Sequence, residues 1–205
     1  MKHFVSALLL VTLLASSAAA LTNKEYFAMK KQDEHFREAD DRLNELWKEL
    51  KSIMPVKDFK ALDKNREEWV RKGRENSVKD FMNDQNIDRV SAYTAATLER
   101  ITYLAEIRLK YVYGTKAVTR DKAMEILKNY LQKNGKFGKN HIIMWEDYEP
   151  SCYFGEKDDG ESWMLRHAVD GEDMIFTLGF YYVRVSDGAI YTLDLVNDEI
   201  IPVEE

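Results

Sequence analysis

The side chains able to act as nucleophiles, general bases or metal ligands are few in this sequence. Its one cysteine, Cys152, lies between His141 and His167 along the chain. A thiol becomes a catalytic nucleophile when a nearby histidine accepts its proton, so Cys152 and His167 on neighbouring strands are one candidate pair. All three residues could instead bind a metal, although their spacing matches no structural zinc motif. The simpler interpretation is a small, half-buried thiol and histidines packed in a sheet.

Other catalytic signatures are missing from the sequence. It has no G-x-S-x-G nucleophile turn, no P-loop and no dinucleotide-binding glycine motif. Paired acids such as Asp40-Asp41, Asp158-Asp159 and Glu204-Glu205 could supply the two carboxylates of a glycosidase, but such pairs are common on the surface of an acidic protein. We therefore predict that the protein is not an enzyme and has no catalytic residues, no cofactor and no metal.

Aromatic and acidic residues of the C-terminal half are better candidates for binding another protein. Tyrosine and tryptophan are dense between residues 148 and 191, and they combine a large contact area with a polar tip. Acidic side chains cluster in the loop 156–161. One more acidic residue, Asp187, precedes Gly188 between two apolar segments. The predicted partner-binding residues are Trp163, Tyr191, Asp187, Asp158, Asp159 and Glu161. The alternative for the aromatic residues is packing in the core and the sheet.

The charge of the chain favours a basic protein as partner. The 205 residues include 36 acidic and 30 basic side chains, which gives a net charge of −6 at neutral pH. This balance argues against nucleic acid and anionic membrane surfaces, which attract basic proteins. A hydrophobic fraction of 45% beside 32% charged residues indicates a folded chain, and a single cysteine excludes an internal disulfide.

The first twenty residues have the layout of a secretory leader. Lys2 precedes an apolar stretch from Phe4 to Ala15, and the segment ends with small residues up to Ala20. The apolar stretch is too short to anchor the protein across a bilayer. We expect cleavage after Ala20, a periplasmic or secreted location, and no membrane association of the cleaved chain.

Residues 21–113 have the pattern of a helical domain. Apolar residues recur at helical spacing, and Pro55 and Gly73 are the only proline and glycine between Asn23 and Tyr113. We expect a first helix ending near Met54, a second over about 56–84 and a third over about 87–112. Pro55 cannot continue the first helix, and short connections make successive helices antiparallel neighbours.

Residues 114–205 have a different pattern, with one helix followed by strands. Thr119 is a candidate cap for a helix that ends near Gly135. Aromatic and β-branched residues then predict strands at His141–Glu146, Ser151–Phe154, Glu161–Val169, Met174–Val185, Ala189–Leu195 and Ile200–Val203. Asp187-Gly188 predicts a two-residue hairpin. The predicted fold class is α+β: a three-helix antiparallel hairpin or bundle, then a small domain of one helix on an antiparallel sheet.

A motif in the helical half carries a family resemblance. Residues 39–50 read A-D-D-R-L-N-E-L-W-K-E-L, with Leu62 and Trp69 in an L-x6-W pattern further on. Over about residues 31–109 the chain resembles the N-terminal domain family of LprI-type lysozyme inhibitors. The resemblance implies a helical fold and inhibition of lysozyme by protein contact. Its motif positions, which we expect to be structural, are Asp40, Leu43, Asn44, Trp47 and Trp69.

The chain departs from that family at several positions. Ser77 and Thr97 stand where the family carries two cysteines, and Gly73 and Ala105 stand where it carries arginines. The C-terminal half is similar, more weakly, to PepSY-type or cystatin-like modules, a likeness carried by residues 119–131 and 180–191. Such modules are usually non-catalytic. The departures leave the fold better supported than the inhibitory activity.

Together these patterns predict an exported, non-enzymatic binding protein. The first hypothesis is a lysozyme inhibitor whose acidic surface meets a basic lysozyme-type enzyme through complementary charge. The alternative is a cell-envelope module that binds a peptide or protein along its sheet edge and inhibits nothing.

Overall fold

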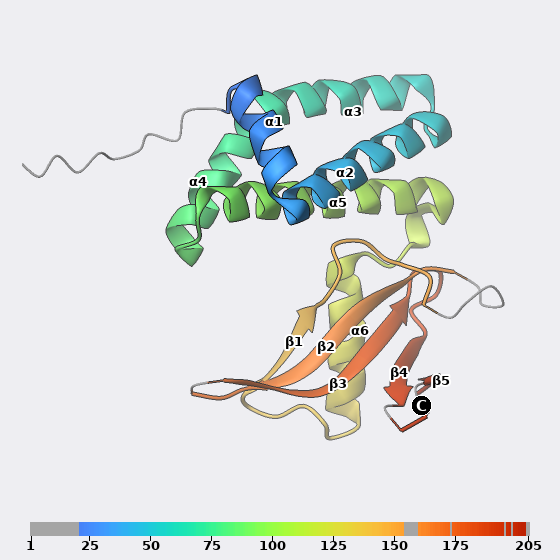
Figure 1. Cartoon of the computed structure of the whole chain (residues 1–205). Coiled ribbons are helices and arrows are strands. Elements are labelled where there is room, and N and C mark those ends of the chain that lie inside the picture. The colour runs from blue at the N-terminus through green and yellow to red at the C-terminus, as the bar shows by residue number, and fades with distance from the viewer. Residues whose placement is uncertain (1–20, 154–159, 173, 195, 198, 204–205) are drawn as a thin grey trace, which may run out of the picture.

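The computed structural model describes residues 21–153, 160–172, 174–194, 196–197 and 199–203. The predicted leader, residues 1–20, and the predicted partner-binding residues Asp158 and Asp159 lie outside these ranges. Within them the fold is α+β, as predicted: five helices in the N-terminal part and a five-stranded antiparallel sheet in the C-terminal part (Figure 1). We call residues 21–113 the helical part and residues 114–203 the sheet part.

The helical part contains more helices than the three predicted. They are α1 (Asn23–Gln32), α2 (Glu34–Ile53), α3 (Val56–Glu68), α4 (Arg74–Gln85) and α5 (Arg89–Val112), with a π-helical turn, Trp69–Gly73, between α3 and α4. Asp33 separates α1 from α2 because its backbone is extended, and its carboxylate accepts a hydrogen bond from the Phe36 amide at 2.7 Å. The chain therefore bends at Asp33, and α1 before it was not predicted as a separate helix.

The longest helix, α5, forms the centre of the helical part. Asn86 adopts a left-handed conformation with φ of 52°, and the Asp88 carboxylate caps α5 by accepting from the Val90 amide at 2.8 Å. The chain thus reverses sharply between α4 and α5. One apolar cluster joins α5 to α2 and α3, and a second joins it to α1, α2 and α4 (Figure 1).

The sheet part is a meander covered on one face by a single helix. The helix is α6 (Arg120–Lys133), and the strands, in spatial order, are β1 (His141–Trp145), β2 (Ser162–Asp170), β3 (Ile175–Arg184), β4 (Ile190–Asp194) and β5 (Glu199–Pro202). As predicted, Thr119 caps the helix. The helix α6 lies across one face of the sheet (Figure 1). Its buried face packs on the inward side chains of β2 and β3, including Trp163 and Val183.

Two local predictions in the sheet part are wrong. The segment predicted as a strand from Ser151 forms one isolated bridge, with Ser162. The hairpin at Asp187-Gly188 has a four-residue connection, because the Arg184 amide donates to the Ala189 carbonyl at 2.9 Å. Val185 causes the longer connection: it is fully buried, and its backbone bonds Val118 and Glu161 instead of β4.

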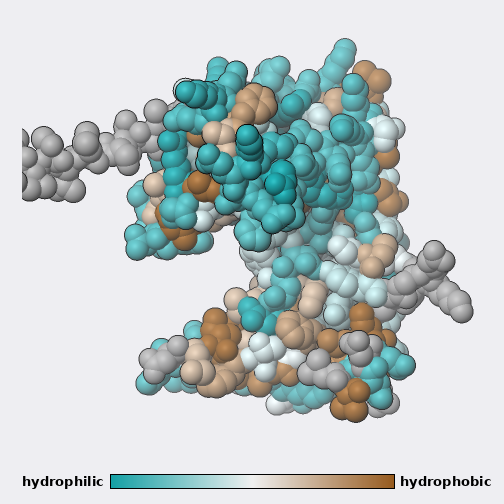
Figure 2. Space-filling view, viewed as in Figure 1, coloured by the Kyte–Doolittle hydropathy of each residue, from teal (hydrophilic) through white to brown (hydrophobic). Residues whose placement is uncertain are grey.

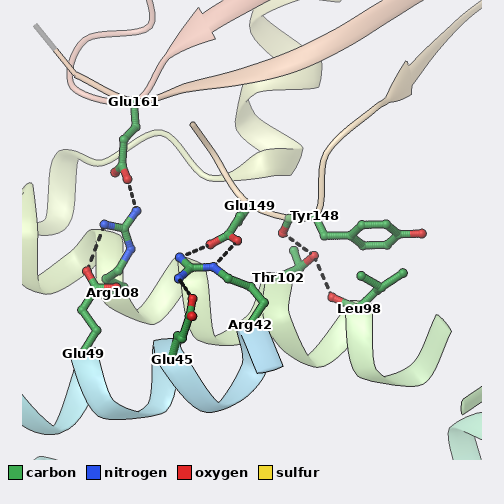
Figure 3. A network of polar contacts seen from close by, with 9 residues as sticks. All are labelled: Arg42, Glu45, Glu49, Leu98, Thr102, Arg108, Tyr148, Glu149 and Glu161. Atoms are coloured by element: carbon green, nitrogen blue, oxygen red, sulfur yellow. Dashed lines mark hydrogen bonds and ion pairs between the residues drawn. The ribbon is translucent and has the colours of Figure 1, made fainter. Parts of the chain in front are cut away.

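The segment between β1 and β2 connects the sheet part to the helical part. Arg42 on α2 donates to both carboxylate oxygens of Glu149, at 2.5 and 2.7 Å (Figure 3). The Thr102 hydroxyl on α5 donates to the carbonyl of Tyr148 at 2.7 Å. A bidentate arginine–carboxylate pair fixes orientation as well as distance, so these contacts hold the segment on the helices.

Arg108, near the end of α5, makes a second connection. It forms an ion pair with Glu161, which precedes β2, and a longer one with Glu49 on α2 at 3.3 Å (Figure 3). Arg108 is 8% exposed, so water screens these pairs only weakly. The network joins three segments that are far apart in sequence.

The surface differs between the two parts. Figure 2 shows a largely hydrophilic helical part and several apolar patches on the sheet part. The free end of the β2–β3 hairpin exposes Met174, Ile175, Phe176 and Leu178. In the part of the chain that the structure describes, no helix is both long and apolar enough to cross a bilayer.

Candidate functional site

A pocket in the helical part has the clearest features of a binding site. It has a volume of about 240 Å³ and lies among α1, α2, the π-helical turn and α5. Its lining combines apolar, aromatic, cationic and acidic side chains: Leu21, Asn23, Tyr26, Asp40, Leu43, Asn44, Trp47, Arg66, Trp69, Val70, Arg74, Arg100 and Leu104. A concave, mostly apolar site with a few convergent polar groups is typical of ligand recognition.

The π-helical turn places one of the aromatic walls. Turns of this kind are rare and often mark functional sites, because the extra residue displaces side chains from the regular helical face. Here the indole of Trp69 lies against Gly73, where an added Cβ would sit 3.0 Å from the Trp69 Cδ1 atom. Any larger residue at this position would push the indole away. The turn and Gly73 together set the position of Trp69.

Asp40 forms the acidic side of the pocket. It is 6% exposed, and its Oδ2 atom accepts hydrogen bonds from the Tyr26 hydroxyl and the Lys30 ammonium, both at 2.6 Å. Burial, together with this hydrogen bond, raises the pKa of Tyr26 to about 12, so the phenol stays protonated and keeps donating. Hydrogen bonding to Asp40 and Asp41 raises the pKa of Lys30. The carboxylate is thus held in place by α1.

Arg100 forms the basic side from α5. Its side chain is almost wholly buried, and its guanidinium lies 5.4 Å from the ring of Trp69 and 4.5 Å from that of Tyr103. One nitrogen donates to the Asn65 side chain at 2.6 Å. Burial lowers the pKa of this guanidinium, but arginine keeps its proton in proteins. A positive charge is therefore held against aromatic faces rather than against a carboxylate.

Arg74 extends the basic side from α4. Its guanidinium lies 5.6 Å from the rings of both Trp69 and Tyr93. Its Nε atom is buried and has no hydrogen-bond partner within the described ranges. A buried donor without a partner is costly, and such groups need an explanation. Arg74 also lines the pocket, so its charge would attract an anion bound there.

Arg66 completes the cationic lining next to Trp47. Its guanidinium lies 5.1 Å from the indole of Trp47, which packs on Phe59 with ring centres 5.3 Å apart. Stacked guanidiniums keep their planar edges free for hydrogen bonds to carboxylate or phosphate oxygens. The arrangement suits a ligand with a negative charge attached to an apolar or aromatic body.

The family-motif residues all reach this pocket. Asp40, Leu43, Asn44, Trp47 and Trp69 line it, although they lie on two segments of the chain. The prediction assigned them a structural role, and the structure adds a shared cavity. Sequence reasoning missed the arginines, because the π-helical turn changes which side chains meet: Arg74, five residues after Trp69, stacks on it. The available signal was the position of two arginines in the sequence, Arg66 three residues before Trp69 and Arg74 five residues after it.

Trp163 does not have the exposure that the partner-binding prediction requires. It is fully buried under α6, and its indole nitrogen donates to the Val118 carbonyl at 2.8 Å. Alternation along β2 directs it into the core, so it cannot touch a partner while the domain is folded. Tyr191 is half-buried on β4, with the Arg184 guanidinium 5.6 Å from its ring.

The two predicted acidic contacts that the structure describes, Asp187 and Glu161, are each paired with an arginine. The Asp187 carboxylate accepts from Arg184 at 2.9 Å and from the Ala189 amide at 3.0 Å. These hydrogen bonds lower the pKa of Asp187, and they give the residue a turn-stabilising role. Glu161 is turned toward the helical part, where it pairs with Arg108. The charge of each is already neutralised by an arginine.

The candidate nucleophile and metal ligands are only partly brought together. His141 Nδ1 and His167 Nε2 are 2.8 Å apart, within hydrogen-bond distance, and the Phe137 ring stacks on His167. Cys152 is exposed and lies near Tyr113 at the end of α5. Among the described residues, no group of three potential ligands is placed to bind a metal. The metal-site alternative is therefore not supported by the geometry of these three residues.

Comparison of the chain with protein-family models, with curated proteins and with solved structures found no match. The resemblance described above therefore stays a hypothesis that rests on the motif residues.

Proposed function

We propose that the protein is an exported, non-enzymatic binding protein that holds its partner through the pocket of the helical part. One observation carries the proposal: the five motif residues Asp40, Leu43, Asn44, Trp47 and Trp69 share the lining of a single cavity. Leu43, Trp47 and Trp69 are only partly buried, so each keeps surface that a ligand in the cavity can contact. Their convergence on an accessible cavity is better explained by a ligand.

The chemistry of the lining specifies the kind of group bound. Arg66, Arg74 and Arg100 supply positive charge, and Trp47 and Trp69 supply flat apolar walls. An acidic side chain or a terminal carboxylate with an apolar neighbour would satisfy both. The cavity is too small for a protein segment beyond one or two side chains, so the rest of the partner would contact the surrounding surface.

The candidate partner is a basic lysozyme-type enzyme, as the resemblance implies. A net charge of −6 on the whole chain would steer such a partner toward the protein, and the pocket would anchor one of its acidic groups. Steering acts mainly on association and anchoring on dissociation. The two contributions are therefore separable by kinetics.

The test measures surface-based binding kinetics of the chain starting at Leu21 with a basic lysozyme. Arg74→Gln should speed dissociation by about tenfold, because one charged hydrogen bond is lost. Arg37→Gln is the matched control: it removes one exposed arginine of α2 outside the pocket and should leave dissociation unchanged. Absence of binding at low salt would overturn the choice of lysozyme as partner.

Small probes test the pocket independently of the partner. Phenylacetate and phenylacetamide have nearly the same shape, but only the first carries a charge. Tryptophan fluorescence should report binding of phenylacetate and much weaker binding of the amide, since Trp47 and Trp69 line the cavity. Equal affinity for the two probes, or no binding of either, would refute the anion-binding pocket.

A second candidate function is binding of an extended peptide along the sheet edge. It is favoured by the free end of β3: β4 pairs only with residues 181–183, whereas β3 begins at Ile175. Phe176 and Leu178 are each 53% exposed beside this edge. The double change Phe176→Ser with Leu178→Ser should leave lysozyme binding unchanged. Loss of binding in this variant, with Arg74→Gln unaffected, would make the sheet edge the site.

A further inference from the structure

Glu75 on α4 is a buried carboxylate with an incomplete set of partners. It is 7% exposed, and its Oε1 atom accepts a hydrogen bond from the Tyr93 hydroxyl. Its Oε2 atom is buried and has no hydrogen-bond partner in the part of the chain that the structure describes. A buried carboxylate is stable only when cations and hydrogen bonds satisfy its oxygens.

The backbone nitrogen of Leu21, the residue that follows the predicted leader, lies at this carboxylate. The Leu21 amide lies 3.4 Å from Glu75 Oε1, a long contact for an amide hydrogen bond. The Leu21 side chain packs on the apolar cluster that contains Phe36 and Val78, and it also lines the pocket. The start of the predicted mature chain is therefore already held at the carboxylate.

We propose that cleavage after Ala20 creates an α-ammonium group at Leu21 that forms an ion pair with Glu75. Hydrolysis of the Ala20–Leu21 peptide bond by a leader peptidase consumes one water. It leaves a carboxylate on Ala20 and an amine on Leu21, which takes up a proton near neutral pH. An amide that donates one hydrogen bond is thereby replaced by a cation that donates three.

The other charged and titratable groups nearby leave this role open. Arg74 on α4 and Arg89 on α5 lie over the face of Tyr93, with distances of 5.6 Å each to the ring, and neither donates to Glu75 Oε2. Tyr26 on α1 donates to Asp40, and Glu25 on α1 accepts from Thr22 in the α1 cap. The ammonium is the group that the cleaved chain adds at this carboxylate.

The ion pair would also complete the binding pocket, a consequence that rests on the proposed function. Leu21 is one wall of the cavity, and Arg74, which stacks on Trp69, directly precedes Glu75. Fixing Leu21 on Glu75 would hold this wall in place. Leader removal would thus link export of the protein to formation of its site.

The experiment compares the full chain starting at Leu21 with the same chain carrying one extra glycine before Leu21. Each is made with and without Glu75→Gln, from a fusion that is cut to leave no other residue. In the Glu75 background, the added glycine should lower Tm by about 4 °C, since it moves the ammonium away. In the E75Q background the two chains should melt within about 1 °C of each other. Equal losses in both backgrounds would overturn the proposal.

Reactivity of the terminal amine gives a second readout that needs no unfolding. An ammonium paired with Glu75 should acylate at pH 7.5 about tenfold more slowly than in E75Q, because each unit of raised pKa leaves tenfold less free amine. Glu67→Gln, an exposed change on α3, is the matched control and should not alter the rate. If E75Q does not fold, the glycine-extended chain replaces it, and equal rates in the two chains would refute the ion pair. Phenylacetate binding that fails while both readouts hold would count against the proposed function only.

Discussion

Two tryptophans, one in each part of the molecule, show how differently the same residue is used. Trp163 in the sheet part is fully buried and donates to the Val118 carbonyl. Trp69 in the helical part is half-buried, lies in a π-helical turn and contacts the guanidiniums of Arg74 and Arg100. The first has the environment of a core residue, and the second lines a pocket. Residue type alone could not distinguish them.

Buried charged residues are also distributed unequally between the two parts of the molecule. Within the described ranges, the buried charged residues are Asp40, Glu75, Arg100 and Arg108, and all four lie in the helical part. Charge is costly to bury, so a protein that keeps it inside one domain and not the other has a use for it there. Arg108 serves the junction with the sheet part, and the other three lie in or next to the pocket. This contrast directs the search for function to the helices.

Trp163→Ala should cause the largest loss of stability. Truncating a fully buried tryptophan leaves a large cavity under α6 and an unpaired Val118 carbonyl, and should cost about 3–5 kcal/mol of the free energy of unfolding. Urea unfolding followed by circular dichroism measures the loss. A cost below about 1 kcal/mol would show that Trp163 is not part of the core. Affinity for phenylacetate, measured on the folded fraction, should not change.

Arg108→Gln should have the next largest effect, because it breaks the connection between the two parts. The change leaves the largely buried Glu161 carboxylate without its cation and should cost about 2–3 kcal/mol. Arg42→Gln is the comparison, since the Arg42–Glu149 pair is more exposed and should cost about 0.5–1 kcal/mol. Urea unfolding of both variants measures the two losses of unfolding free energy. Equal losses would mean that burial of the ion pair is unimportant.

Trp69→Ala should reduce stability less and binding more. A half-buried indole with two cation–π contacts should contribute about 1–2 kcal/mol to the free energy of unfolding. The same change removes a wall of the pocket, so phenylacetate binding should fall below detection. A stability loss as large as that of Trp163→Ala, with unchanged binding, would reverse the comparison and make Trp69 a core residue.

Some of the fold was predictable from the sequence because its signals are local. Periodicity located the helical regions, five of the six predicted strands are present, and Thr119 was recognised as a cap. The helix α1, which precedes the cap at Asp33, was missed because the apolar stripe that marks α2 begins only at Phe36. The turn after Val185 was missed because its cause, burial of Val185 against Val118, comes from tertiary structure.

The candidate site was less predictable than the fold. The motif residues were identified, but their convergence depends on the π-helical turn, for which the sequence has only Gly73 as an indication. Trp163 and Tyr191 were assigned to a partner surface, with core and sheet packing as the alternative, because alternation places half of the aromatic residues on each face without saying which face is covered. The position of α6 decides that question, and it places Trp163 inside.

The smallest expected effect concerns pH and belongs to the sheet part alone. His167 is buried, and its ring lies within hydrogen-bond distance of His141 and stacks on Phe137. Burial, and to a lesser degree the neighbouring His141, lowers the pKa of His167. The folded state therefore favours the neutral ring, and the unfolded state takes up a proton first as pH falls.

Stability should accordingly be highest above the unfolded pKa of about 6.5 and should fall as pH drops below it, by at most about 1.4 kcal/mol per pH unit for one proton. His167→Gln keeps a hydrogen-bonding side chain that does not titrate in this range, so its Tm should change less between pH 7 and pH 5.5 than that of the unaltered chain.

His35→Gln, at an exposed position on α2, should leave the pH dependence unchanged. The pocket contains no histidine, so phenylacetate affinity should be the same at both pH values. If H167Q and the unaltered chain lost stability equally, the buried His167 would not be the source. If H35Q instead reduced the change in Tm between pH 7 and pH 5.5, the pH sensitivity of stability would belong to the helical part.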